Sequence, residues 1–240
     1  MSSTTRDYSA RFMLPELIER GRDELIKCPV YYDGALAAPS AGTVSLYKPD
    51  NTKAVDGATV TISGSVAQYT ITTATLSGET LGEGWRVEWS LTMPDSVDHL
   101  FRNTAALVRG RLYMPITDDD LIRVVSGLDP SSSTALSSVS NWQSYISEAW
   151  LTIELRLINQ GNRPNLILDP SALREASLAL TLALIFDDLS TRLNEAYETR
   201  AAKYRDQFEG AWGRLRFDYD TDDDGTADQT KRPAMATVWL

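Results

Sequence analysis

The sequence predicts a multidomain α+β protein with strands in its first half and helices in its second. Between residues 28 and 114 apolar residues alternate with polar ones, which is the spacing of a strand with one buried face. After residue 114 apolar residues recur every three or four positions, as on a helix. Because 240 residues can form two ordinary domains, the change of period predicts a domain boundary near Met114.

Four parts are expected. An N-terminal arm or short helices (1–27) precede a β domain (28–114), a helical bundle (115–217), and an acidic loop with a C-terminal arm (218–240). In the first part, Pro15 before Glu16 is typical of a first helical turn, and Gly21 interrupts the pattern. We therefore expect short helices there and not one continuous helix.

Short alternating runs predict the strands of the β domain. Gly64-Ser65 between two runs predicts a tight hairpin. Short strands with polar turns are typical of an immunoglobulin-like β-sandwich, with Trp85, Trp89 and Tyr69 in its core. The same residue types would suit an exposed strip that stacks sugars. The runs are Val30–Tyr32, Thr43–Tyr47, Ala58–Ile62, Ala67–Thr72, Trp85–Met93, Val97–Phe101 and Ala106–Tyr113.

Capping residues mark the beginning of the helices. Thr117 precedes three aspartates that favour the positive end of a helix dipole. Asn141 begins a helix that Gly161 and Pro164 end, and Asp169-Pro170 begins the next one. The last helix, about 194–215, carries an aromatic stripe. Four helices in this order predict a compact bundle.

Composition limits the functions that the chain can have. Its net charge of −10 argues against a protein whose main task is to hold nucleic acid. An acidic, solvated surface is the simplest interpretation of this charge, and a conduit to which DNA does not stick is the alternative. A Cys-His catalytic pair would need the single cysteine, Cys28, and the single histidine, His99. Neither lies in a recognisable motif, and no phosphate-binding loop is present. We therefore expect a protein that is not an enzyme.

One motif has the early spacing of a calcium loop. Alternate carboxylates converge on a hard cation in such loops, and a glycine permits the sharp turn. Here the glycine is Gly225, but the twelfth position holds Lys231 in place of the usual acid. A solvated acidic turn is the alternative. The candidate calcium ligands are Asp220, Asp222, Asp224 and Asp228.

The helical half contains four segments in sequence, which are DDDLIRVVSGL, NWQSYISEAWLTIELRLINQGNRPNLI, DPSALREASLALTLALIFDDL and the aromatic-striped last helix. In their order and length these segments resemble the head-to-tail adaptor (connector) proteins of tailed bacteriophages. The resemblance implies a four-helix adaptor-type bundle in a structural protein of the virion neck, made in the host bacterial cytoplasm. The β half, with LGEGWRVEWSL, is similar to immunoglobulin-like modules of phage structural proteins.

The resemblance also implies the partners. The protein would form a ring, of twelve subunits in the family, that docks beneath the portal protein and joins it to a tail-side neck or tail-terminator protein. DNA would pass through the lumen during genome ejection without sequence-specific binding. The β domain would project outward or contact the capsid. The alternative is a surface module in which the β-sandwich binds a glycan or a host ligand.

The C-terminal arm is expected to bind the portal protein. Pro233 cannot continue a helix, and β-forming residues follow it, so the arm could add a strand to a neighbouring sheet edge. A tail without a fixed contact is the alternative. The expected partner-binding residues are Pro233, Met235, Thr237, Val238, Trp239 and Leu240.

Overall fold

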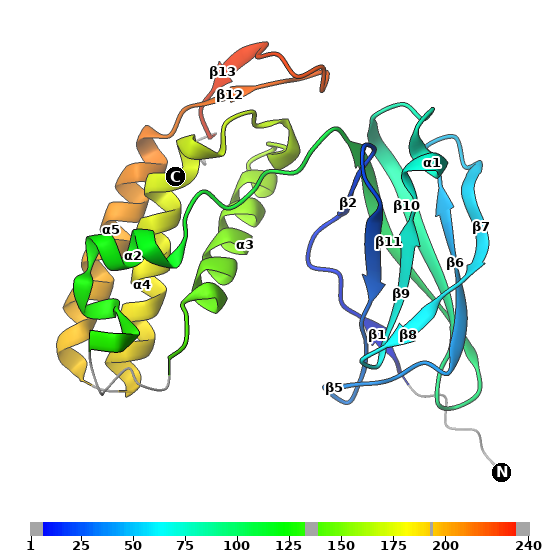
Figure 1. Ribbon diagram of the computed structural model, residues 1–240, viewed down its shortest axis with the longest axis horizontal. Coiled ribbons are helices and arrows are strands. Elements are labelled where there is room, and N and C mark those ends of the chain that lie inside the picture. Colours follow the sequence, from blue (N-terminus) through cyan, green and yellow to red (C-terminus); the bar gives the residue numbers. More distant parts are fainter. Residues whose placement is uncertain (1–6, 133–138, 193, 234–240) are drawn as a thin grey trace, which may run out of the picture. The chain divides into compact units, whose positions relative to one another are not determined.

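The computed structural model describes residues 7–132, 139–192 and 194–233 and has a mixed α+β architecture (Figure 1). The chain divides into two compact units, Met1–Arg111 and Leu112–Leu240, which we call the β unit and the helical unit. The division falls close to the change of period near Met114. Each unit is described by itself.

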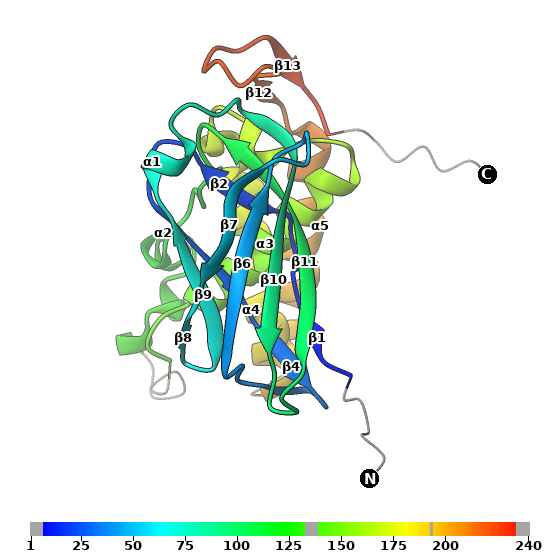
Figure 2. The same cartoon turned by 90° about the vertical axis from the view of Figure 1, so that its right-hand side faces the viewer.

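A five-stranded sheet forms the larger layer of the β unit (Figure 2). The edge strand β2 pairs in parallel with β11, and the remaining neighbours are antiparallel. The longest pairing joins β10 to β11 from Thr92 opposite Asp98 to Trp85 opposite Ala105, after which the register shifts before Gly82 opposite Leu107. Its strand order is β2 (Glu16–Glu19), β11 (Asp98–Val108), β10 (Gly82–Thr92), β6 (Ala41–Tyr47) and β7 (Lys53–Thr59).

Two three-stranded sheets complete the β unit. One contains β3 (Glu24–Cys28), β9 (Val66–Ile71) and β8 (Thr61–Ser63), and a short helix, α1 (Thr73–Leu76), follows it. Gly64 and Ser65 have φ of +54° and +67° and join β8 to β9 in a two-residue turn, which confirms the predicted hairpin. The other sheet contains β1 (Ser9–Ala10), β4 (Val30–Tyr32) and β5 (Ala35–Leu36).

One hydrophobic core lies between the two main sheets. Val44, Val87 and Trp89 come from the five-stranded sheet, whereas Ile26 and Ala67 come from β3 and β9. Trp89 is 1% exposed and Trp85 is 2% exposed, so the prediction that both are core residues is confirmed. Neither indole can therefore stack on a sugar. Tyr69 packs against the same core and is partly buried.

The expected short helices between residues 7 and 27 are wrong. These residues form β1, β2 and β3 instead. Three further boundaries differ from the prediction. Most of the run 97–101 and the first three residues of the run 106–113 belong to one strand, β11, and residues 109–113 lie outside any strand. The run 58–62 is divided between β7 and β8.

The helical unit is built around α4, which packs against α3 and α5 (Figure 1). A turn of 3-10 helix, Pro170–Leu173, leads into α4, and a second one, Glu195–Tyr197, leads into α5. The two strands that follow α5 form a hairpin. The elements are α2 (Asp118–Val124), α3 (Gln143–Asn159), α4 (Arg174–Arg192), α5 (Glu198–Arg214), β12 (Phe217–Tyr219) and β13 (Gln229–Lys231).

Side-chain hydrogen bonds lie at the start of the helical segments. The Thr117 N–H donates to the Asp120 carboxylate at 2.9 Å, in a capping box at the start of α2 that confirms the predicted cap. Asn141 precedes the N-cap of α3, Trp142, and accepts from the Gln143 N–H at 3.1 Å. Asp169 caps the turn of 3-10 helix before α4 and accepts from the Ser171 N–H at 2.8 Å. These contacts satisfy backbone donors that a helix leaves free at its N-terminus.

Two apolar clusters form the core of the helical unit. One joins α3 and the start of α4 to the end of α5 and to Phe217 and Tyr219 of β12. The other joins α2, Trp142 and the second half of α4. In the described part of the chain, no helix has the length and apolar character needed to cross a membrane.

Candidate docking region and acidic loop

The β12–β13 hairpin is fixed to the connection between α3 and α4. Tyr219 bridges to Ile167, and the Asp220 N–H donates to the Leu166 carbonyl at 2.9 Å. The hydroxyl of Tyr219 accepts from the Arg163 N–H at 3.0 Å. Because Tyr219 is also a core residue, the hairpin is a fixed part of the helical unit. The segment after β13 therefore leaves from a rigid base.

The acidic loop between β12 and β13 is ordered by its own first aspartate. Asp220 is only 1% exposed, and its two carboxylate oxygens accept from the Asp224 N–H at 3.0 Å and the Gly225 N–H at 2.6 Å. Gly225 has φ of +95°, a conformation that suits glycine. The loop thus turns back over a buried carboxylate, with the glycine at its sharp turn.

Three of the four predicted calcium ligands come together. One carboxylate oxygen from each of Asp220, Asp222 and Asp224 lies within 4.8 Å of the others. Desolvation raises the pKa of Asp222, and the negative charge of Asp224 raises it further. A bound cation would relieve that repulsion. Calcium needs about six to eight oxygens, so carbonyl groups and water would have to supply the rest.

Asp228 does not belong to that group of three. Its Oδ2 accepts from the Thr221 N–H at 2.7 Å, across the base of the loop. Lys231, at the twelfth position of the motif, lies on β13 with its Nζ 3.5 Å from the centre of the Tyr219 ring. The structure thus gives Asp228 and Lys231 contacts that hold the hairpin closed.

The predicted partner-binding residues of the arm lie mostly beyond the described chain. Pro233 is described and is buried. The other five predicted residues lie outside the described residues, so the binding of the arm to the portal stays a prediction. Those residues are Met235, Thr237, Val238, Trp239 and Leu240.

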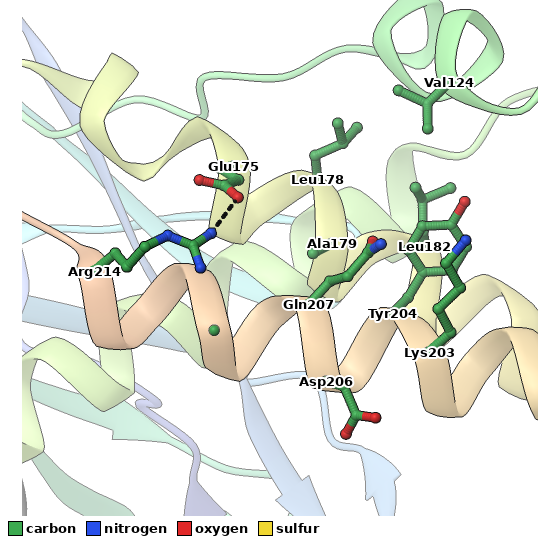
Figure 3. Close-up of a pocket in the computed structure, with 11 residues that line it drawn as sticks. Val124, Glu175, Leu178, Ala179, Leu182, Lys203, Tyr204, Asp206, Gln207 and Arg214 are labelled. Atoms are coloured by element: carbon green, nitrogen blue, oxygen red, sulfur yellow. Dashed lines mark hydrogen bonds and ion pairs between the residues drawn. The ribbon is translucent and has the colours of Figure 1, made fainter.

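A surface groove of about 670 Å³ runs along α4 and α5 (Figure 3). Lys203 and Gln207 line it from α5, and at one end Arg214 Nη2 lies 2.7 Å from Glu175 Oε1. Val124 of α2 is 51% exposed at the other end. The groove therefore combines an accessible apolar surface with charges at its rim. Its apolar lining consists of Val124, Leu178, Ala179, Leu182 and the ring of Tyr204.

Sequence reasoning missed this groove. Leu178 and Leu182 lie on α4, and Leu182 is buried. Val124, at the end of the apolar residues of α2, is a signal that could have pointed to this surface. A surface formed by three helices depends on their packing, which periodicity alone does not give.

The cysteine and the histidine have separate structural roles. Cys28 is buried in the core of the β unit, and desolvation raises the pKa of its thiol to about 12. Such a thiol is a weak nucleophile at neutral pH. His99 Nε2 lies 3.2 Å from Asp95 Oδ2, and the His99 ring contacts the edge of the Tyr8 ring.

Comparisons of this chain with family models, curated proteins and solved structures gave no match. The candidate sites therefore rest on the residues and contacts described above.

Proposed function

We propose that the protein is a structural component of the bacteriophage neck, a head-to-tail adaptor without enzymatic activity. It would dock as a ring beneath the portal, link the portal to the tail and leave a channel for DNA. One observation carries the proposal. A hairpin fixed into the helical core by Tyr219 is followed by the uncharged segment 234–240, which has the composition of a docking segment.

The fold supports this interpretation in two ways. We interpret the β unit as an immunoglobulin-like sandwich, because its two main sheets share one core. We interpret α2 to α5 as a four-helix adaptor-type bundle, since α4 contacts α2, α3 and α5. The β unit would then be an addition that projects outward or contacts the capsid.

The partners follow from the same proposal. They are the portal protein, a tail-side neck or tail-terminator protein, and further copies of the chain in a ring that would have twelve subunits. The net charge of −10 suits a channel that DNA traverses without sequence-specific binding. Assembly would begin in the host bacterial cytoplasm and end in the virion neck.

The groove on α4 and α5 is a suitable contact for the neighbouring subunit. A ring needs two different faces on each subunit, one of which fits the other. Exposed Val124 supplies apolar area that a contact would bury, and the Glu175–Arg214 pair supplies rim charges. We expect Val124→Asp to weaken ring formation, with Thr152→Asp on an exposed position of α3 as the matched control. Ring formation is measured by mass photometry.

Calcium would serve the docking region if it binds the acidic loop. A cation held by Asp220, Asp222 and Asp224 would stiffen the base of the arm. Isothermal titration of the full chain with calcium tests this idea, and Asp222→Asn is the variant of choice because Asp220 also holds the loop backbone. If the titration with calcium releases the same heat for wild type and for Asp222→Asn, the loop is a solvated acidic turn and not a calcium site.

Co-sedimentation with purified portal rings tests the main proposal. The full chain is compared with a truncation after Pro233, which keeps the hairpin and its core residues Phe217 and Tyr219 intact. We expect the full chain to sediment with portal rings and the truncation to remain in the supernatant.

A full-length variant with Val238, Trp239 and Leu240 replaced by serine is the matched control for chain length. It should behave like the truncation, because apolar contacts would provide the docking energy. Equal binding by all three proteins would remove the arm from the proposal. No binding by any of them would argue against an adaptor.

A further inference from the structure

The groove on α4 and α5 has a buried apolar floor and a polar rim (Figure 3). On the floor, Ala179 is 6% exposed and Leu182 is 1% exposed. On the rim, the side chains of Lys203 and Gln207 are exposed to water. An apolar segment of chain could cover such a floor with its side chains, while the rim groups donate hydrogen bonds to its backbone carbonyls.

A glycine of α5 keeps the groove open near one end. Gly210 lines the groove, and a Cβ atom at this position would meet only Arg214 Nη1, at 3.4 Å. The packing of the helical unit therefore leaves room for a side chain here. Glycine destabilises the interior of a helix relative to alanine, so α5 is less stable for having this opening.

The β12–β13 hairpin directs the residues after it toward the same end of the groove. Lys231 pairs with Phe217 in antiparallel register, so the chain after Lys231 runs back toward the residues that precede Phe217. Arg214, at the end of the groove, lies three residues before Phe217. Pro233 is buried, so the chain is still in contact with the protein at the last residue that the structure describes.

The segment 234–240 has the length and the composition to cover the groove. Between Arg214 and Lys203, α5 rises by about 16 Å at 1.5 Å per residue. Seven residues of extended chain reach about 23 Å. The sequence of the segment, AMATVWL, has no charged side chain and ends in three large apolar residues. It therefore suits the apolar floor better than water.

We propose that the groove on α4 and α5 binds the segment 234–240 of the same chain. Attachment to Pro233 gives the segment an effective concentration on the order of millimolar, so a weak contact is enough to fill the groove. In an adaptor, the segment and the groove would both be withheld from other proteins until a portal takes the segment. That consequence rests on the proposed function, whereas the contact within one chain does not.

Fluorescence polarisation with a fluorescein-labelled peptide of residues 234–240 tests the contact. The acceptor is the full-length variant with Val238, Trp239 and Leu240 replaced by serine, which leaves the groove open. We expect this variant to bind the peptide at least tenfold more tightly than wild type, whose own segment occupies the groove. Equal binding to both proteins, or no binding to the serine variant, would overturn the proposal.

A glycine pair in the serine variant shows whether the peptide lies in the groove. Gly210→Gln fills the groove and is expected to weaken peptide binding at least tenfold. Gly213→Gln is the matched control, because Gly213 is also on α5, is exposed and does not line the groove. It should leave the affinity unchanged. Equal affinities in the two variants would overturn the proposal.

A second pair of variants keeps this test independent of the glycines. Val124→Asp places a charge on the apolar lining, and Thr152→Asp places one on an exposed position of α3. We expect only Val124→Asp to weaken peptide binding, again at least tenfold. Circular dichroism checks that each variant is folded. Folded Val124→Asp protein with full affinity for the peptide would contradict the proposal.

Analytical ultracentrifugation distinguishes the same chain from a second copy as the source of the segment. We expect wild type and the serine variant to sediment as monomers at the concentrations of the binding assay. A wild-type dimer that the serine replacements dissociate would place the segment in the groove of a second copy, and would overturn the contact within one chain. Neither assay contains a portal, so a failure of the adaptor proposal leaves these results unchanged.

Discussion

The β unit and the helical unit place their ion pairs differently. In the β unit Arg111 lies among acids that are almost fully buried, such as Glu24. The helical unit also has strongly exposed pairs, and in the Glu175–Arg214 pair both side chains are about two-thirds exposed. Buried pairs are costly to break, whereas exposed pairs contribute little to stability. We therefore expect the ion pairs of Arg111 to contribute more to the stability of the β unit than the Glu175–Arg214 pair contributes to that of the helical unit.

Replacement of the two arginines should give the largest difference. We expect Arg111→Met to lower the stability of the β unit by about 3 kcal/mol, because it leaves Glu19 and Glu24 short of positive charge. Arg214→Met should cost less than about 1 kcal/mol, since its partner Glu175 stays hydrated. Urea denaturation followed by circular dichroism and tryptophan fluorescence measures both. Equal losses in the two variants would contradict the comparison.

The two most buried tryptophans extend the comparison to the cores. Both Trp89 and Trp142 are 1% exposed, but Trp142 Nε1 donates to the Leu128 carbonyl at 2.9 Å. Trp89 Nε1 has no hydrogen-bond partner among the described residues. Replacement by phenylalanine leaves a buried acceptor unpaired only at Trp142.

We therefore expect Trp142→Phe to cost about 2 kcal/mol and Trp89→Phe about 1 kcal/mol, each measured by thermal and urea unfolding. Circular dichroism separates the loss of helix from the loss of strand. A Trp89→Phe variant that loses more stability than Trp142→Phe would show that the shape of the β core outweighs hydrogen bonding.

The smallest expected effects are opposite responses to pH of two acids, Glu16 in the β unit and Asp120 in the helical unit. Burial raises the pKa of Glu16 in the β unit, and the nearby Glu24 adds to the rise although Arg111 opposes it. A raised pKa means that the fold favours the protonated acid, so this stabilisation is lost as pH rises through the folded-state pKa. Glu16→Gln should gain stability relative to wild type as pH increases from about 4 to 7.

Asp120 in the helical unit should respond in the other direction. Burial alone would raise the pKa of Asp120, but the Thr117 N–H and Arg174 lower it below its ordinary value. A lowered pKa gives stability that is present at neutral pH and lost as pH falls through the folded-state pKa. Asp120→Asn should cost about 1 kcal/mol at pH 7 and less at about pH 3. Unfolding curves of the two variants and of wild type at both pH values measure these effects. The same trend with pH for Glu16→Gln and Asp120→Asn would refute the prediction.

Local signals predicted the parts of the fold that depend on neighbours in sequence. The Gly64-Ser65 hairpin, the Thr117 cap and the end of α3 at Gly161 all follow from backbone chemistry within a few residues. The core positions of Trp85 and Trp89 follow from alternation along one strand.

Contacts between distant residues explain the failures. Along β3 the residues Glu24, Ile26 and Cys28 are buried while Leu25 is 47% exposed, so polarity does not alternate with burial. Glu24 can face inward because Arg111, far along the chain, balances its charge. No pattern within β3 shows that Arg111 is the partner of Glu24, and short helices were therefore expected in this part of the chain. The groove on α4 and α5 was missed for a similar reason, since three helices must pack before it exists.

Electron microscopy of portal rings mixed with this protein tests the adaptor proposal most directly. The account predicts an added ring of subunits on one face of the portal, which is present with the full chain and absent with the truncation after Pro233. Portal rings that look the same with and without saturating protein would contradict the account.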